Sequence, residues 1–492
     1  MSPGTAPISL YNTLTRRVEP LATGEQGHVR MYVCGVTVYD HAHIGHGRML
    51  TVFDVLARYL TWVGEKLTYV RNITDIEDKI IGRAGEAGEP AAVLADRMTA
   101  AFLEDMKSLG CRPPSVEPRA TEHIAEMLEL IGRLEDRGIA YRADGDVYFS
   151  VPAYPAYGRL SNRRLEDLQA GARVEVDERK RHPCDFVLWK GAKPGEPVWE
   201  SPFGPGRPGW HIECSAMASK YLGQPFDLHG GGEDLVFPHH ENEIAQSEAA
   251  TGTPFVGHWM HVAFLRLGEE KMSKSLGNFV TIREALEQYP CEALRLALLQ
   301  THYRSPLEFS PALVEEAQRT LVRLYETLAR IDATGAAPTD DAADALVCRR
   351  DFRDALADDL NTPRGLAALH DAVRAANRLL DAGRDAEAAA LGAALRDTAS
   401  VFGVLQGNPV ETLRAWRSGR AAAAGLSDQE IEAIIERRRD ARRAKDFAAA
   451  DAARDELVAA GIDLKDHPDG TTTWSLRRAG APAGRDGRGG IG

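Results

Sequence analysis

Two periodicities of hydrophobic and polar positions alternate near the start of the chain. Residues 28–33 and 67–73 are short apolar-rich runs typical of buried strands. Between them, apolar side chains recur at helical spacing, which predicts a helix from about residue 45 to 62. This order predicts a strand–helix–strand unit of an open α/β sheet, in which ligands bind at the carboxyl ends of the strands.

Further along the chain this pattern gives way to others. Polar and turn-rich stretches predict an insertion between two halves of the sheet, and from about residue 310 the sequence is Ala-, Leu- and Arg-rich and predicts helices. Breaks at 335–340 and 406–409 divide these helices, and Ser427 and Glu430 fit a capping box. We therefore expect segments at residues 1–114, 115–205 (the insertion), 206–309, 310–405 and 406–478, with a disordered tail at 479–492.

Length and composition restrict the class of protein. A chain of 492 residues is too long for one compact core, and 44% hydrophobic with 27% charged residues is ordinary for a globular protein. No apolar run is long enough to span a bilayer, and no basic region followed by an apolar core opens the sequence. We expect a cytoplasmic protein that does not bind membranes.

The net charge of −13 is unevenly distributed. Residues 406–492 hold 15 Lys and Arg against 14 Asp and Glu, a net charge of +1, so the rest of the chain carries −14. RNA contact is therefore best sought in the C-terminal part, at clusters such as 437–439 and 442–443. On charge alone, a solvated helix face is the simpler interpretation of these clusters.

Two short motifs suit the handling of ATP. His43-Ile44-Gly45-His46 would begin the first predicted helix, where free N–H groups and the helix dipole favour phosphates. Lys271-Met272-Ser273-Lys274-Ser275 places two ammonium groups in a loop bounded by glycines, which could close over a triphosphate. Each motif alone is weak, but in this order and context they indicate ATP chemistry.

Together the two motifs resemble the signatures of class I aminoacyl-tRNA synthetases. The segments at 31–40 and 209–217 resemble cysteinyl-tRNA synthetases in particular, and the similarity runs from about Leu10 to about Trp474. The resemblance implies a Rossmann-like parallel-sheet catalytic domain with an insertion, followed by a helical bundle and a small C-terminal anticodon-binding domain. It also implies activation of L-cysteine by ATP, accompanied by Mg²⁺, and transfer to the terminal ribose of tRNA(Cys).

Four residues form a candidate metal site. His239 and Glu243 are four apart after Pro238, which puts both on one helical face, and Cys34 and Cys214 end or begin core elements near the same rim. On the residues alone, a Cys-Cys-His-Glu site and two core thiols beside a capped helix are equally good interpretations. The resemblance favours the site, because these positions match the family's zinc ligands, and it implies one zinc ion per chain. His211, His240 and Glu241 are interpreted as supporting or structural.

Zinc would allow such an enzyme to distinguish cysteine from serine. A pocket that merely tolerates a changed polar atom discriminates by about 10²-fold, which is too little for cysteine against serine in translation. Zinc binds a thiolate readily, whereas an alcohol is a poor ligand. Four protein ligands leave no open position, so we expect either a fifth ligand or displacement of Glu243 when substrate binds. Trp210 and Thr74 are the predicted contacts of cysteine, although Trp210 could equally be a core side chain.

The remaining site residues follow from the resemblance. His43 and His46 would bind phosphates and ribose, Gly45 would let adenine lie on the backbone, and Lys271 and Lys274 would hold the departing pyrophosphate. Further ATP contacts are expected at Thr37, His229 and Gly231, and tRNA contacts at Arg442, Asp451 and Asp466. We expect a monomer.

Two other functions fit parts of the sequence. A ligase that transfers cysteine to an amino sugar would share the catalytic half but would not need residues 406–474. A non-catalytic RNA-binding paralogue would gain nothing from the intact His43, His46, Lys271 and Lys274. The length of the chain and its second motif exclude a small HxGH nucleotidyltransferase.

Overall fold

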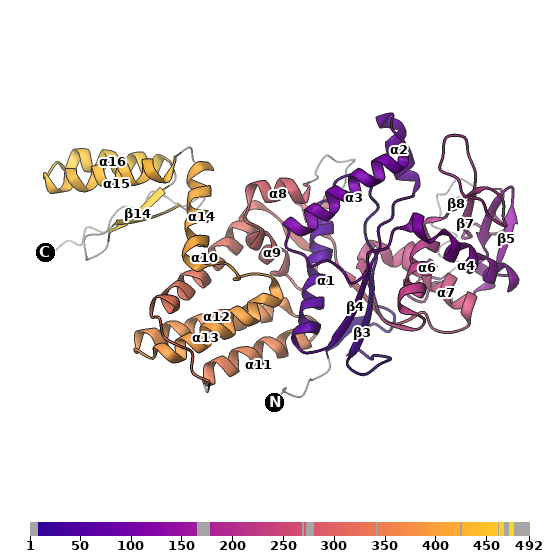
Figure 1. The fold of residues 1–492 in the computed structure, drawn as a ribbon, viewed down its shortest axis with the longest axis horizontal. Coiled ribbons are helices and arrows are strands. Elements are labelled where there is room, and N and C mark those ends of the chain that lie inside the picture. Colours follow the sequence, from indigo (N-terminus) through magenta and orange to yellow (C-terminus); the bar gives the residue numbers. More distant parts are fainter. Residues whose placement is uncertain are drawn as a thin grey trace. The chain divides into compact units, whose positions relative to one another are not determined.

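A parallel sheet lies at the centre of the N-terminal part of the chain (Figure 1). In this computed structural model, residues 8–164, 178–267, 270–271, 280–340, 342–423, 426–460, 462–466 and 472–476 are described. The strand order is β10-β9-β3-β4 and every neighbouring pair is parallel. The strands are β3 (His28–Val33), β4 (Lys66–Arg71), β9 (Phe226–Gly232) and β10 (Val256–Val262).

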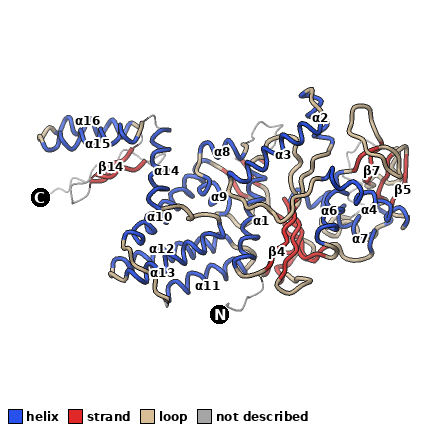
Figure 2. The backbone as a smooth tube through the Cα atoms, in the orientation of Figure 1, coloured by secondary structure: helices blue, strands red, loops and turns tan. Residues whose placement is uncertain are grey.

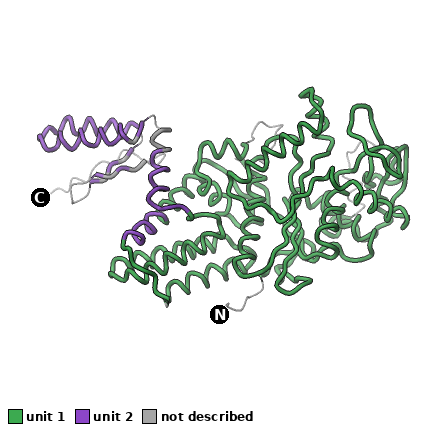
Figure 3. Tube along the Cα trace, viewed as in Figure 1, with its two compact units in different colours: residues 1–324, 334–406 green, residues 325–333, 407–492 purple. Residues whose placement is uncertain are grey.

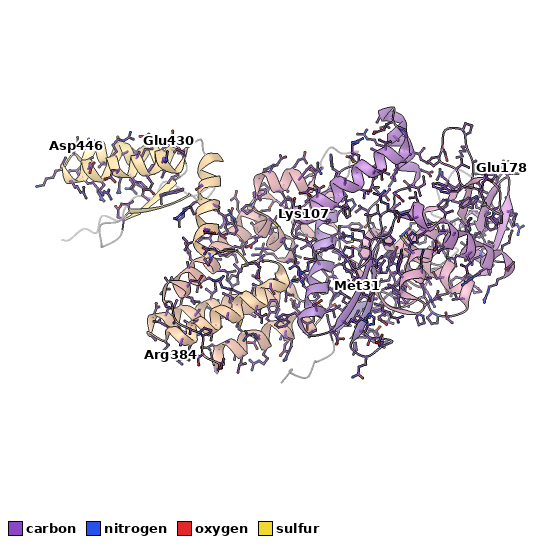
Figure 4. All side chains as sticks on the ribbon, viewed as in Figure 1. Met31, Lys107, Glu178, Arg384, Glu430 and Asp446 are labelled. Carbon is purple, nitrogen blue, oxygen red and sulfur yellow. The ribbon has the colours of Figure 1, made fainter. Side chains whose placement is uncertain are left out.

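Helix α1 (Ile44–Trp62) connects β3 to β4, which confirms the predicted strand–helix–strand unit. It lies on one side of the sheet, while α6 (Trp210–Leu222) and α7 (Glu241–Thr251) lie on the other (Figure 1). Side chains fill both interfaces, and Met31 of β3 is completely buried (Figure 4). Both faces of the sheet are therefore covered, so ligands can approach only at its ends.

The described part of the region between β4 and α6 contains three α-helices and a second sheet. Helices α2 (Asp78–Ala87) and α3 (Ala91–Ser108) follow β4. After α4 (Ile124–Asp136), an antiparallel sheet forms in the order β5-β6-β7-β8. Its strands are β5 (Ala140–Ala143), β6 (Asp146–Phe149), β7 (Phe186–Gly191) and β8 (Gly206–Pro208). Part of the predicted insertion, residues 165–177, lies outside the described residues.

Several short strands flank the central sheet, and the chain that follows it is mainly helical, drawn in blue in Figure 2. Strand β11 pairs with both β12 and β13, and an N-terminal hairpin pairs β1 with β2. Their bounds are β1 (Ser9–Asn12), β2 (Arg17–Pro20), β11 (Leu265–Leu267), β12 (Glu270–Lys271) and β13 (Leu307–Phe309), with α8 (Ile282–Gln288) and α9 (Cys291–Leu299) between β12 and β13.

The predicted helical region consists of α10 (Pro311–Ala333), α11 (Ala343–Ala357), α12 (Thr362–Asp381) and α13 (Asp385–Phe402), of which the last three pack against one another. None of the helices in the described ranges is long and apolar enough to cross a membrane.

The chain divides into two compact units (Figure 3). Unit 1 comprises residues 1–324 and 334–406, and unit 2 comprises residues 325–333 and 407–492. Unit 2 contains α14 (Pro409–Ala423), α15 (Asp428–Arg443) and α16 (Phe447–Ala459), with an antiparallel pair β14 (Ile462–Asp466) and β15 (Thr472–Leu476).

Unit 2 has a small apolar core of its own, to which Leu457 and Trp474 contribute. The predicted capping box is confirmed: the Ser427 side chain accepts from the Glu430 N–H, and the Glu430 side chain (labelled in Figure 4) accepts from Ser427 N–H. The predicted tail at 479–492 lies outside the described residues.

Candidate active site

The predicted metal ligands come from separate elements that end at one rim of the sheet. Cys34 directly follows β3, and its N–H donates to Gly230 O of β9 at 3.0 Å. Cys214 lies near the start of α6 and Glu243 in the first turn of α7. His239 lies in the wide turn Val236–His240 that precedes α7. Because parallel strands end at the same edge, these four residues meet although they are far apart in sequence.

The four side chains are buried, and their ligand atoms all lie within 4.8 Å of one another. Cys34 Sγ is 3.6 Å from Cys214 Sγ and 3.5 Å from Glu243 Oε1, and His239 Nε2 is 3.0 Å from Glu243 Oε1. Tetrahedral zinc, with metal–ligand lengths of about 2.0–2.3 Å, needs ligand atoms roughly 3.3–3.8 Å apart. The sulfur distances fall in this range, and the donor set of two sulfurs, one nitrogen and one oxygen suits zinc.

Protonation within the cluster follows from burial and from the charges in it. Although burial opposes it, the Glu243 carboxylate raises the pKa of His239 to about 10. A hydrogen bond from Cys34 lowers the pKa of Cys214 to about 6, while burial and the neighbouring Cys214 raise that of Cys34. Despite burial, His229 and His239 keep the pKa of Glu243 well below its ordinary value. A metal ion must therefore displace protons from this cluster when it binds.

Two further histidines reach the cluster: His240, for which the sequence predicts a supporting or structural role, and His229, for which it predicts an ATP contact. His240 Nε2 lies 3.3 Å from Cys34 Sγ, and His229 Nε2 lies 2.8 Å from Glu243 Oε2. Cys34, His229, His240 and Glu243 thus form a second set that could hold a metal. His229 ends up there because it lies on β9, beside Cys34, at the edge where the strands end.

We favour the first ligand set for two reasons. It contains two thiolates, which zinc prefers. Its Cys34, Cys214 and His239 also line a cavity of about 310 Å³ that a substrate can enter, whereas His229 and His240 do not line this cavity. His240 Nδ1 instead lies 2.8 Å from His261 Nε2, an outer contact of the kind that fixes the orientation of a histidine.

The same cavity contains most of the residues predicted to contact substrates. It is lined by Thr37, His43, Gly45, His46, Thr74 and Trp210, together with the three metal ligands. The His229 ring, which we predicted to contact ATP, is fully buried against Glu243, and Gly231 is also buried. The neighbouring Gly232 does line the cavity. The glycine-rich end of β9 therefore reaches the cavity through Gly232.

His43 and His46 begin α1 with their rings stacked, at a centroid distance of 3.7 Å. The His43 side chain caps the helix by accepting from the His46 N–H at 3.2 Å. A side chain at Gly45 would approach the His43 ring to within 2.8 Å, so only glycine leaves this turn open. The arrangement presents imidazoles and a helix N-terminus to the cavity, which suits phosphate groups.

Trp210 lies on the cavity wall beside the proposed metal ligand His239. Its ring stacks on that of His239 at a centroid distance of 4.4 Å, and it is only partly buried. Thr74, also on the cavity wall, accepts from the Asn72 side-chain amide at 3.1 Å. Both side chains therefore lie on the wall of the cavity that Cys34, Cys214 and His239 also line.

The lysine motif is described only at its first residue. The Lys271 backbone forms part of β12, and Lys274 lies outside the described residues. The predicted tRNA contacts belong to unit 2. Asp466 accepts from both terminal nitrogens of Arg438 at 2.8 Å and from Arg442 at 2.7 Å, while Asp451 is exposed on α16.

Three stretches of the chain match known families. Residues 20–319 match the tRNA synthetases class I (C) catalytic domain, residues 351–406 the DALR domain, and residues 425–474 the cysteinyl-tRNA ligase anticodon binding domain.

Curated proteins similar to this chain include two bacterial cysteine–tRNA ligases. That of Thioalkalivibrio sulfidiphilus is 55% identical over 466 residues, covering 94% of this chain and 99% of that protein. That of Geobacter sulfurreducens is 53% identical over 480 residues, covering 96% and 100% respectively.

Solved structures share the fold at low sequence identity. The methionyl-tRNA synthetase of Mycobacterium tuberculosis in complex with methionyl-adenylate has a TM-score of 0.57 at 18% identity, covering 76% of this chain and 89% of that one. The LeuRS–tRNA–LeuAMS complex of Agrobacterium radiobacter K84 also has a TM-score of 0.57, at 12% identity, covering 80% and 86%.

Proposed function

Because this chain belongs to the cysteine–tRNA ligases of the class I aminoacyl-tRNA synthetase family, we propose that Cys34, Cys214, His239 and Glu243 hold a zinc ion that selects cysteine. The protein is an aminoacyl-tRNA ligase that charges tRNA with cysteine, using ATP. The observation that carries the zinc proposal is the buried quartet of ligand atoms on the wall of the same cavity as His43 and His46.

The quartet fits zinc in its donors and its sulfur distances, as argued above. Bound there, zinc would supply a Lewis-acidic centre that takes a thiolate as ligand far more readily than an alcohol, and so would separate cysteine from serine. Trp210 packs on the His239 ring and would exclude larger side chains from the space beside the ligands. Selectivity would then come from chemistry at the thiol and from the size of the pocket.

In the first step the carboxylate of cysteine attacks the α-phosphorus of ATP and pyrophosphate leaves. We infer that His43 and His46 contact the phosphates at the start of α1, that Gly45 and Thr37 leave room for the nucleoside, and that Lys271 and Lys274 balance the charge of pyrophosphate, with Mg²⁺ accompanying ATP. No protein nucleophile is needed, because positioning and electrostatics suffice. In the second step a hydroxyl of the terminal ribose of tRNA attacks the activated carbonyl and AMP leaves.

Unit 2 is the proposed reader of the anticodon, with Arg442, Asp451 and Asp466 as its contacts. Single-stranded bases are where proteins read RNA sequence, and exposed arginines and aspartates suit their edges. We also propose that the enzyme is a monomer and acts in the cytoplasm, where tRNA is used for protein synthesis.

The alternative in which cysteine is transferred to an amino sugar would leave unit 2 without a purpose, and a non-catalytic RNA binder would not need the cavity. The test is transfer of labelled cysteine, with ATP and Mg²⁺, from the zinc-replete protein to tRNA with a GCA anticodon. Acid-precipitable, cysteine-specific charging is expected. Cysteine-dependent ATP–pyrophosphate exchange without charging would instead support the small-molecule ligase, and loss of both would leave a binder.

A further inference from the structure

Arg48, one turn into α1 after His43 and His46, is almost completely buried at 1% exposure. Its guanidinium donates to four backbone carbonyls. Nη1 donates to Ala263 O at 2.9 Å and to Phe264 O at 2.8 Å. Nη2 donates to His302 O at 3.2 Å and to Ser305 O at 2.6 Å.

Burial of the charged Arg48 guanidinium costs free energy. No carboxylate lies within ion-pair distance of Arg48 in the described ranges, and its Nε has no hydrogen-bond partner there. Arg295, an equally buried arginine, is paired with Asp54 at 2.5 Å. Burial lowers the pKa of Arg48 to about 10, and the charge of Glu233 opposes this only in part. A buried charge with no ion pair in direct contact is a poor source of stability, so what Arg48 provides is geometry: a planar fork that fixes several carbonyls at once.

The carbonyls bound by Arg48 belong to two segments beside the active-site cavity. Ala263 and Phe264 line the cavity and precede β11, while His302 and Ser305 lie in the connection from α9 to β13. The two segments are also joined directly, since Ala263 N donates to Tyr303 O at 2.9 Å and Leu307 N donates to Phe264 O at 3.0 Å. Arg48 therefore joins α1 by hydrogen bonds to the two segments that precede β11 and β13.

Strand β11 in turn pairs with β12, which contains the first lysine of the predicted motif, because Arg266 lies opposite Lys271 in the β11–β12 ladder. After the motif, the chain pairs with the residues at the start of α1. Ile44 N donates to Val280 O, and Ile282 N donates to Ala42 O, both at 3.0 Å. Both described flanks of the lysine motif are thus hydrogen-bonded to the start of α1 or to Arg48.

We propose that Arg48 is a positioning residue for adenylate formation: it sets β11, and with it the Lys271 backbone, at a fixed distance from His43 and His46. This inference rests on the proposed roles of those residues in ATP binding. Arg48 is not proposed to touch a substrate. Its loss is therefore expected to slow adenylate formation, which needs His43, His46 and Lys271 at fixed positions relative to one another, and to leave the binding of cysteine unchanged.

The test is Arg48→Lys, which keeps the charge but cannot span four carbonyls, with Arg295→Lys as the matched control for a buried arginine. ATP–pyrophosphate exchange gives kcat and the KM for cysteine, while zinc content and the thermal midpoint are measured in parallel. Arg48→Lys is expected to lower kcat by roughly 10²-fold, with zinc content and the KM for cysteine within about threefold of the parent. Arg295→Lys is expected to lower the thermal midpoint while kcat stays within about threefold.

Arg48→Gln, which brings no charge into the core, is the second variant should Arg48→Lys not fold, and the same fall in kcat is expected. The proposal is overturned if a folded Arg48 variant keeps the parent's kcat, or if Arg295→Lys loses kcat to the same extent. Failure of the proposed function is distinguishable, because the parent enzyme itself would then show no cysteine-dependent exchange.

Discussion

Two clusters of charged and polar side chains, one in each unit, differ in how deeply they are buried and in the partners of their polar atoms. In unit 1, Cys34, Cys214, His239 and Glu243 are buried, and their ligand atoms converge on one point. In unit 2, Asp466 has a side chain that is 39% exposed, and its oxygens accept from Arg438, Arg442 and Thr472.

The difference shows what each cluster is suited to do. A buried set of two sulfurs, a nitrogen and an oxygen is a costly arrangement unless something bridges the atoms, as the proposed zinc ion would. An exposed carboxylate held by two arginines is already satisfied and can exchange a partner with little cost, as a base-reading residue must. Burial with convergent ligand atoms therefore supports the proposed metal site, whereas the exposed ion pairs of Asp466 are compatible with the proposed anticodon contact.

The largest expected effect comes from Cys214→Ser. Removal of one thiolate should abolish stoichiometric zinc binding and lower kcat/KM for cysteine activation by roughly 10³-fold or more. Zinc content and ATP–pyrophosphate exchange measure this, with the partly exposed Cys184→Ser as the control that keeps both. Full zinc content in Cys214→Ser would exclude this residue as a ligand.

A smaller effect is expected of His240→Asn, which separates the two possible ligand sets. If His240 only supports Cys34, zinc affinity should fall by about 10- to 100-fold, while zinc-saturated protein still holds one ion. His239→Asn, by contrast, should lose the ion altogether. Competition with a chelator measures both affinities, and the reverse ranking of the two variants would favour the second ligand set.

In unit 2, Asp466→Asn should lower kcat/KM for tRNA charging by an amount equivalent to about 1–3 kcal/mol, while cysteine activation is unchanged. Its matched control is Asp455→Asn, an exposed aspartate of α16. If Asp466→Asn charges tRNA with the same kcat/KM as the parent, Asp466 is not an anticodon contact.

The smallest effect concerns pH. Hydrogen bonds from Arg438 hold the pKa of Asp466 well below its ordinary value, although burial opposes this. A depressed pKa stabilises the fold above the unfolded-state value of about 3.9, and this contribution is lost as pH falls below it. The protection of unit 2 from hydrogen exchange should therefore stay constant between about pH 5 and 7, within the scatter of the measurement. It should decrease toward acid pH. Asp466→Asn should abolish that acid-dependent loss, and an unchanged loss would contradict the role of this carboxyl.

Local patterns allowed much of the fold to be predicted, because they reflect local physics. The helix from 44 to 62 and the capping box at Ser427 depend on spacing and on neighbours in the sequence, and both were found. The antiparallel sheet of the insertion was not, since pairs such as those of β6 and β7 join residues about 40 positions apart.

The site shows the same limit. The spacing of His239 and Glu243 and the positions of Cys34 and Cys214 near one rim suggested a metal site, and the resemblance decided in its favour. His229 and His240 reach the cluster through the pairing of β9 with β3 and through ring orientation, neither of which is visible in a sequence. Arg48 gave no signal at all, because an arginine in a helix is usually solvated; only its four carbonyl partners reveal its place.

The most direct test of the account is X-ray absorption at the zinc edge of the purified enzyme, alone and with saturating cysteine or serine. The account predicts stoichiometric zinc with the sulfur ligands of Cys34 and Cys214, and one additional sulfur ligand when cysteine is added but not serine. Absence of zinc, or a sulfur count that cysteine does not change, would contradict the claim that this cluster selects the substrate.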